Sequence, residues 1–256
     1  MDVLSLSILG IVTGSVAGLL SAGGGMIIFP MLHAMYPDLT THAIVTVCLN
    51  QILCAGFVAY AMHNRIQKQR IISLPYKLVY FVILIVMTLY LSWFHVNPAL
   101  ISILFILFLG IGLTLRLVMK LRVDFPFNEK HILLSLIFTS VYGVTVGMGG
   151  SLILYPLLRI GQLSPQKTLR LCAYNAFSVG LIGAIAHNLS YVLEIKDQSF
   201  PWEILSLILI TSSVTSYYMA QYAYKLKGST IDHLSNLLIA SIIVFYSYEL
   251  YVGKLH

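Results

Sequence analysis

Long runs of apolar residues, separated by short polar connections, follow one another along the whole chain. A run of about 20 such residues is long enough for an α-helix to cross the apolar core of a bilayer. The connections carry proline, asparagine, aspartate and basic residues, as loops do. The runs are Val3–Tyr36, Ala43–Met62, Leu74–Trp93, Ala99–Met119, Ile132–Ile160, Thr168–His187, Trp202–Ala220 and Leu234–Tyr251. The pattern predicts an all-α membrane protein in which glycines interrupt the first and the fifth run.

The composition agrees with a membrane protein and excludes a soluble globular domain. Hydrophobic residues make up 59% of the 256 residues and charged residues only 9%, whereas soluble domains contain about 25% charged residues. The three cysteines, Cys48, Cys54 and Cys172, are scattered through apolar runs. They are too few and too far apart for a disulfide framework or a zinc site. We therefore expect them to be small core residues, and we expect neither a metal nor a cofactor.

Lysines and arginines gather at four of the connections, and basic residues of this kind mark cytoplasmic loops. The groups are Arg65, Lys68, Arg70 and Lys77; Arg116, Lys120, Arg122 and Lys130; Arg159, Lys167 and Arg170; and Lys225 and Lys227. Placing all four groups in the cytoplasm leaves only Lys196 and Lys254 outside. The net charge of +6 is therefore a topology signal rather than a patch for nucleic acid. Both termini are expected on the extracytoplasmic side.

The chain contains an internal repeat. Residues 21–32, SAGGGMIIFPML, align without a gap with residues 147–158, GMGGSLILYPLL, at an offset of 126. We therefore divide the chain into a first repeat, 1–125, and a second repeat, 126–256. Each contains one interrupted run and three uninterrupted ones, and this odd number of net crossings inverts the second repeat relative to the first. Inverted repeats are typical of secondary transporters, in which the substrate site lies near the membrane midplane.

The interruptions differ from ordinary helix positions because small residues follow one another directly. Glycine in a helix costs about 1 kcal/mol relative to alanine, and lipid cannot satisfy the backbone groups that a break sets free. The segments after the breaks, Met26–Tyr36 and Leu152–Leu163, contain about a dozen residues each. As helices they would span roughly 17 Å, about half a bilayer, so both breaks are expected near the midplane. Each interrupted run is either a re-entrant hairpin or a pair of short crossings. The breaks are Gly23, Gly24 and Gly25, and Gly149, Gly150 and Ser151.

The segments after the two breaks begin near the midplane and run to opposite surfaces. Their helix N-termini, with free N–H groups and a partial positive charge, would both point at the centre of the membrane. No lysine, arginine or carboxylate lies deep in a predicted span. The pattern favours a small anion, bound by dipoles and neutral groups and moved by alternating access. Pro30 and Pro156 lie too far along these segments for a first helical turn, so each is expected to bend its helix.

Small residues also recur every four positions ahead of each break. This spacing places them on one helix face and lets a second helix approach closely. We therefore expect these positions to serve packing rather than binding. They are Gly10, Gly14, Gly18 and Ala22 in the first repeat, and Ser135, Thr139, Gly143, Gly147 and Ser151 in the second.

Asn50 and its repeat partner Asn175 lie about 10 Å into the spans that follow the interrupted runs. An asparagine at this depth is costly unless it is paired. Each therefore either lines the substrate site or makes an interhelical hydrogen bond. Thr46, Gln51 and Tyr174 are weaker candidates for the same site on neighbouring helix faces.

Two histidines, His63 and His187, fall near the ends of spans on opposite sides, and we interpret them as interfacial or helix-terminal rather than as a proton relay. Ser151 and His187 could also suggest the serine–histidine pair of an intramembrane hydrolase. The predicted topology separates them by roughly 15 Å in depth, and the first repeat has Gly25 where Ser151 stands. Both features disfavour an enzyme. A membrane subunit without transport activity is a further alternative.

Three strings together resemble the sulfite exporter TauE/SafE family, also called the 4-toluene sulfonate uptake permeases. They are G-x3-G-x4-GGG-x4-P-x-L near the N-terminus, the segment Ala43-x2-Thr46, and a second copy, GGS-x4-P-x-L. The resemblance implies a plasma-membrane transporter whose partners are the bilayer and a small anion such as sulfite, sulfoacetate or a sulfonate. The family's hairpin residues carry over to Gly23, Gly24, Gly25 and Pro30, and to Gly149, Gly150 and Pro156. The chain departs from the pattern at Ser21, Ser151 and Leu171.

Overall fold

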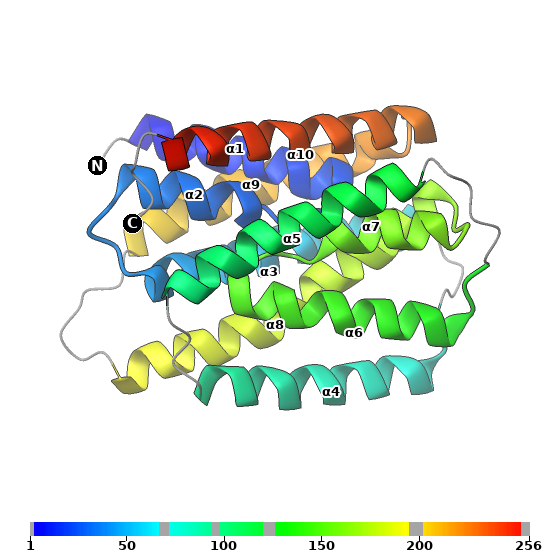
Figure 1. The fold of residues 1–256 in the computed structure, drawn as a ribbon, viewed down its shortest axis with the longest axis horizontal. Coiled ribbons are helices and arrows are strands. Elements are labelled where there is room, and N and C mark those ends of the chain that lie inside the picture. Colours follow the sequence, from blue (N-terminus) through cyan, green and yellow to red (C-terminus); the bar gives the residue numbers. More distant parts are fainter. Residues whose placement is uncertain (1–2, 67–71, 94–97, 120–125, 195–201, 252–256) are drawn as a thin grey trace.

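The computed structural model describes residues 3–66, 72–93, 98–119, 126–194 and 202–251, and every regular element within them is an α-helix (Figure 1). The predicted runs are confirmed as helices, and both interrupted runs are split at the small residues. The helices are α1 (Val3–Leu20), α2 (Gly25–Met35), α3 (Thr41–Ile66), α4 (Leu74–Trp93), α5 (Pro98–Met119), α6 (Glu129–Val146), α7 (Ser151–Ile160), α8 (Pro165–Glu194), α9 (Trp202–Ala223) and α10 (Gly228–Tyr251). Several basic residues of the topology prediction lie outside the described residues: Lys68, Arg70, Lys120, Arg122, Lys196 and Lys254.

The outer surface of the bundle carries large apolar side chains. Leu4 of α1 is 68% exposed, Val82 of α4 60% and Ile210 of α9 64%. Soluble monomers rarely expose contiguous apolar surface on this scale, so lipid is the solvent for these faces. Among the described residues, four helical segments are long and apolar enough to cross a membrane: α1, α3, α9 and Pro165–Leu189 of α8.

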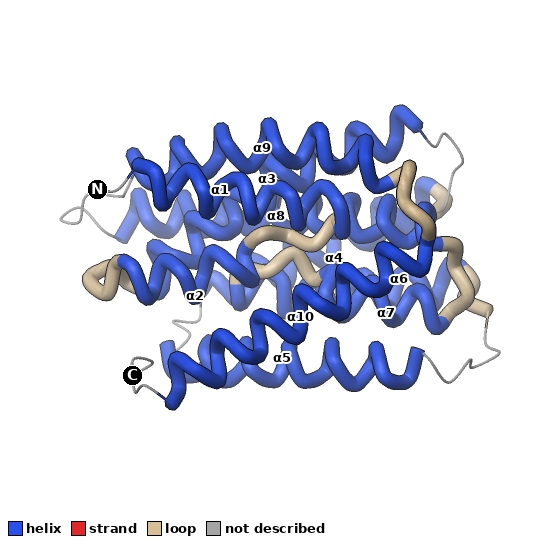
Figure 2. The backbone as a smooth tube through the Cα atoms, turned by 90° about the horizontal axis from the view of Figure 1, so that it is seen from above, coloured by secondary structure: helices blue, strands red, loops and turns tan. Residues whose placement is uncertain are grey.

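Two helical hairpins, α1 with α2 and α6 with α7, enter the bundle from opposite ends (Figure 2). Residues 21–24 connect the first pair and residues 147–150 the second. These two connections, which we call the break loops, lie in the middle of the bundle, where Figure 2 draws them in tan. Helix α1 begins and helix α10 ends at the same end of the molecule (Figure 1). Each hairpin thus starts and finishes at one end of the bundle.

The second break loop depends on two glycines with left-handed backbone. Gly147 has φ +71° and caps the C-terminus of α6, where its N–H donates a hydrogen bond to the Gly143 carbonyl oxygen. Gly150 has φ +70° and immediately precedes α7. This conformation costs other L-residues about 1–2 kcal/mol. The first break loop uses Ser21, at φ +50°, to leave α1, so the two loops do not share one backbone course.

The small residues of α1 allow this helix to lie directly against α9. A side-chain carbon added to Gly14 would lie 2.3 Å from the Ser212 carbonyl oxygen, and one added to Gly18 would lie 2.5 Å from the Ser216 carbonyl oxygen. Such distances exclude any larger residue. The prediction that the glycines of α1 serve packing is confirmed. Helix α3 packs against both α8 and α9.

Candidate functional site

The two break loops touch each other. A side-chain carbon added to Gly23 would lie 2.8 Å from the amide nitrogen of Gly149. One added to Gly25 would lie 1.9 Å from the carbonyl oxygen of Gly147. A side chain at either position would overlap the opposite loop. The two backbones can therefore meet because these residues have no side chains.

Helices α2 and α7 both begin at this meeting point and run to opposite ends of the bundle (Figure 2). Their N-caps are Gly24 and Gly150, and neither provides a side-chain cap. A helix N-terminus leaves its first N–H groups without intrahelical partners and carries a partial positive charge. Two such ends therefore lie close together. Pro30 and Pro156 occupy the interiors of the two helices, as predicted.

Side chains tie the first break loop both to the second hairpin and to α3. Ser151 Oγ donates a hydrogen bond to the carbonyl oxygen of Ser21. The Ser21 hydroxyl in turn lies 2.9 Å from Nε2 of His63. Ser21, which the sequence marks only as a departure from a family pattern, is thus the residue that connects both elements.

His63 lies in the last turn of α3, in agreement with its helix-terminal interpretation. Its side chain is nevertheless fully buried, and the ring of Tyr224, which directly follows α9, lies 5.2 Å from the imidazole, centroid to centroid. His187 stacks on His42, with ring centroids 5.0 Å apart. Among the described contacts, Ser151 bonds the Ser21 backbone and His187 stacks on His42, whereas the hydroxyl of Ser21 lies beside the imidazole of His63.

Asn175 is fully buried and holds the second break loop in place. Its Nδ2 donates to the Gly149 carbonyl oxygen at 3.0 Å. Its Oδ1 lies 3.0 Å from the hydroxyl of Tyr80 and 2.7 Å from that of Ser140. The amide thus connects α8, α4 and α6 to the loop. Tyr80 and Ser140 were not among the predicted site residues, since a lone hydroxyl in an apolar span does not reveal its partner.

Asn50 makes an interhelical hydrogen bond, one of the two roles that the sequence predicts for it. Its amide pairs in both directions with that of Asn188, at 3.2 Å, and joins α3 to α8. Its Nδ2 also donates to the Thr46 carbonyl oxygen at 2.8 Å. The Thr46 hydroxyl donates to the His42 carbonyl oxygen, one helical turn earlier. Both side chains are therefore occupied by protein groups.

Gln51 is the polar side chain that the structure leaves facing the first break loop. It is fully buried on α3, and neither Oε1 nor Nε2 has a hydrogen-bond partner within the described part of the chain. Both atoms lie 2.8 Å from where a side-chain carbon on Gly24 would stand. A buried amide without partners costs about 1–3 kcal/mol. Gln51 thus directs an unused donor and an unused acceptor at the start of α2.

Tyr174 lies apart from the break loops, in a pocket between α3, α4 and α8. Its hydroxyl is buried and has no hydrogen-bond partner among the described groups. The pocket is lined by Tyr60, Ile72, Lys77, Arg170, Leu171 and Tyr174. The structure therefore separates Tyr174 from Gln51, although the sequence grouped them as candidates for one site.

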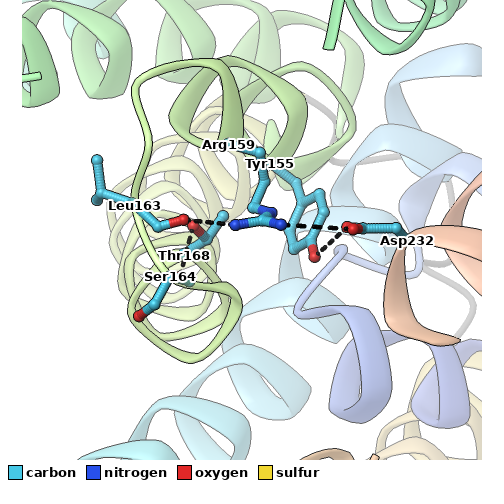
Figure 3. Close-up of polar contacts among 6 residues, drawn as sticks. All are labelled: Tyr155, Arg159, Leu163, Ser164, Thr168 and Asp232. Carbon is cyan, nitrogen blue, oxygen red and sulfur yellow. Dashed lines mark hydrogen bonds and ion pairs between the residues drawn. The ribbon is translucent and has the colours of Figure 1, made fainter. Parts of the chain in front are cut away.

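A polar cluster fastens the far end of α7 to the start of α10 (Figure 3). Tyr155 donates to Asp232 Oδ1 at 2.7 Å, and Nη2 of Arg159 lies 3.5 Å from Asp232 Oδ2. Nη1 of Arg159 also donates to the Leu163 carbonyl oxygen at 2.7 Å. Asp232 joins α10 to α7 in this way. Within the described residues, no group of three or more His, Cys, Asp or Glu side chains could hold a metal ion.

Comparison with known proteins gives two matches across most of the chain. A family model described as "Sulfite exporter TauE/SafE" matches residues 6–246. A curated "Probable membrane transporter protein" from Haemophilus influenzae is 26% identical over 252 residues, which cover 93% of this chain and 91% of the relative. No solved structure matches.

Proposed function

Since the chain belongs to the sulfite exporter TauE/SafE family and is a multi-pass membrane transporter, we propose that it carries small anions through a site between its two break loops. Sulfite, sulfonates and related organic anions are the substrates that the family resemblance favours. The substrate would bind where α2 and α7 begin and would reach the two sides of the membrane by alternating access. The transporter would reside in the plasma membrane.

The unpartnered amide of Gln51 is the observation that carries this proposal. It is aimed at Gly24, the N-cap of α2, and helix N-termini bind anions through their N–H groups. Nε2 of Gln51 would add a neutral donor to the same ligand. Without a cation at the break loops, the anion would be held by dipoles and hydrogen bonds alone. Such a site releases its ligand more readily than a salt bridge would.

The pattern of helix contacts supports the proposal of two inverted repeats, 1–125 and 126–256. Helix α1 packs on α9 as α6 packs on α4, and α2 packs on α3 as α7 packs on α8. A two-fold axis that exchanges α1–α5 with α6–α10 would map the α1–α9 contact onto the α6–α4 contact. It would likewise map the α2–α3 contact onto the α7–α8 contact. Gly23 and Gly149 are equivalent in the repeat alignment and touch each other, as residues on a two-fold axis do. The axis would then pass through the break loops, near the midplane.

The distribution of basic residues supports an orientation for this arrangement. Arg159 near the end of α7, Arg170 near the start of α8 and Lys225 between α9 and α10 belong to one end of the bundle (Figure 1). Helix α1 begins and α10 ends at the other end. If basic residues mark the cytoplasm, both termini lie outside.

Anion flux into proteoliposomes tests the proposed function. The purified protein would be reconstituted and challenged with sulfite, thiosulfate, sulfoacetate, taurine and a short carboxylate. We expect saturable flux of at least one sulfur oxyanion or sulfonate, and none in empty liposomes. Flux of none of the panel above the liposome background would contradict the proposal.

A further inference from the structure

The pocket that contains Tyr174 carries two cations from different helices. Lys77 comes from the first turn of α4, and Arg170 comes from the beginning of α8. The space around its lining side chains is about 260 Å³ when the open solvent at the mouth is counted. No carboxylate is among its six lining residues. Because both cations line the same pocket, a ligand in it would lie beside positive charge from two helices.

The Tyr174 hydroxyl, on a residue that lines this pocket, is a neutral donor. Tyr174 is 6% exposed, and its buried hydroxyl has no hydrogen-bond partner in the described part of the chain. The ammonium of Lys77 lies 5.6 Å from the centre of the Tyr174 ring. An ammonium, a guanidinium and a hydroxyl on one pocket suit a ligand with several acceptor oxygens. An oxyanion has them, and its charge is complementary to the two cations.

The position of the pocket relates it to the break loops. The Tyr174 ring contacts the ring of Tyr80, with centroids 5.7 Å apart. The Tyr80 hydroxyl bonds Asn175, whose amide holds the Gly149 carbonyl oxygen. Contacts through Tyr80 and Asn175 therefore connect the pocket lining to the second break loop.

We propose that the Lys77–Arg170 pocket is a second anion site, a vestibule that binds a small sulfur oxyanion or sulfonate before it reaches the break loops. This inference rests on the proposed function. The vestibule opens at the basic end of the bundle and concentrates anions there. The break loops, which lack charged side chains, bind them afterwards. The positive charges of Lys77 and Arg170 thus attract the anion to the vestibule. Neutral donors at the break loops then bind it weakly enough for release.

Neutralising the two cations tests the vestibule. In proteoliposomes, Lys77→Gln and Arg170→Gln should each raise the KM for the transported anion about tenfold, because a charge-assisted contact is lost. The maximal flux should change much less. Added inert salt should raise the KM of the wild type more than that of the double variant. Lys77→Arg should restore most of the affinity. Lys167→Gln, a basic residue of α8 outside the pocket lining, is the matched control and should keep the wild-type KM.

Equilibrium binding separates failure of the vestibule from failure of the proposed function. Sulfite would be titrated into the purified protein, the double variant Lys77→Gln/Arg170→Gln, and Gln51→Leu. We expect Gln51→Leu to lose flux but retain the binding that depends on the two cations. A wild type that transports anions, with KM and binding unchanged in the double variant, would overturn the vestibule alone. Binding that needs the two cations, without flux of any anion, would overturn the proposed function alone. A wild type that neither binds nor transports sulfur anions would overturn both.

Discussion

Gly23 and Gly149 meet backbone to backbone at the centre of the bundle. A side-chain carbon added to either would lie 2.8 Å from the amide nitrogen of the other. The two residues are 126 positions apart, the offset of the sequence repeat. The contact therefore joins equivalent points of the two repeats, and it brings the starts of α2 and α7 together.

Enlarging a break-loop glycine should abolish transport while leaving a folded protein in the membrane. Valine at Gly24 would overlap Gln51 and Thr13, and valine at Gly150 would overlap Asn175 and demand a left-handed backbone. We expect flux in proteoliposomes to fall at least about a hundredfold for either variant, because a displaced N-terminus no longer presents its N–H groups to the ligand.

The control for these variants is Gly110→Val. Gly110 lies in α5 with no other group within 4 Å of an added side-chain carbon, so flux should remain at the wild-type level. The folding of each purified variant would be checked by gel filtration and circular dichroism. Undiminished flux in Gly24→Val and Gly150→Val would remove the break loops from the site.

Gln51→Leu should lose transport without losing stability. The native amide is buried and has no hydrogen-bond partner among the described residues, so an apolar side chain of similar size removes an unfavourable burial of about 1–3 kcal/mol. We expect the unfolding midpoint in detergent to stay level or rise and anion flux to fall. Asn50→Leu provides the contrast, because it strands the amide of Asn188 and should lower the midpoint. A lower midpoint in Gln51→Leu would mean that Gln51 has a structural partner instead.

Asn175 should be coupled energetically to Tyr80. Asn175→Leu removes one hydrogen bond each from the Gly149 carbonyl oxygen and from the hydroxyls of Tyr80 and Ser140, and we expect it to destabilise the protein by about 1–3 kcal/mol. Tyr80→Phe removes one hydroxyl of the same network. In a double-mutant cycle followed by chemical unfolding, the pair should show a coupling of about 1 kcal/mol. Additive effects of the two substitutions would exclude the network as a unit.

Both ends of the chain should be reachable from outside the cell. Single cysteines added after the C-terminus and before the N-terminus should react with a membrane-impermeant maleimide in intact cells. A cysteine in the connection between α9 and α10 should react only after the membrane is opened. Labels on opposite sides for the two termini would reject the inverted repeats, and labels for both only after lysis would reverse the orientation.

The helices and their two interruptions could be predicted closely from the sequence. The predicted segment after the first break, Met26–Tyr36, is α2 (Gly25–Met35) displaced by one residue. The second, Leu152–Leu163, overlaps α7 (Ser151–Ile160), which stops earlier because Gly161 and the turn after it end the helix. Such accuracy is expected where lipid is the solvent, because each span must satisfy its own backbone groups.

The roles of single polar residues were less accessible to the sequence. Asn50 and Asn175 occupy equivalent positions in the repeat, yet one pairs with Asn188 and the other holds Gly149. His63 lies in the last turn of α3, as the sequence indicates, but its burial beside Ser21 and Tyr224 could not be predicted. No local pattern distinguishes these outcomes, since every decisive partner comes from a distant segment.

The sequence by itself determined that the protein is a helical membrane bundle, where its spans lie and where its two hairpins break. These features depend on hydropathy and on backbone hydrogen bonds, which are satisfied within a segment. Only the tertiary structure decided that the break loops touch, that Gln51 faces α2 without a partner, and that Lys77 and Arg170 share one pocket. Side-chain hydrogen bonds and charge clusters join residues far apart in the chain, so their geometry exists only once the helices have packed.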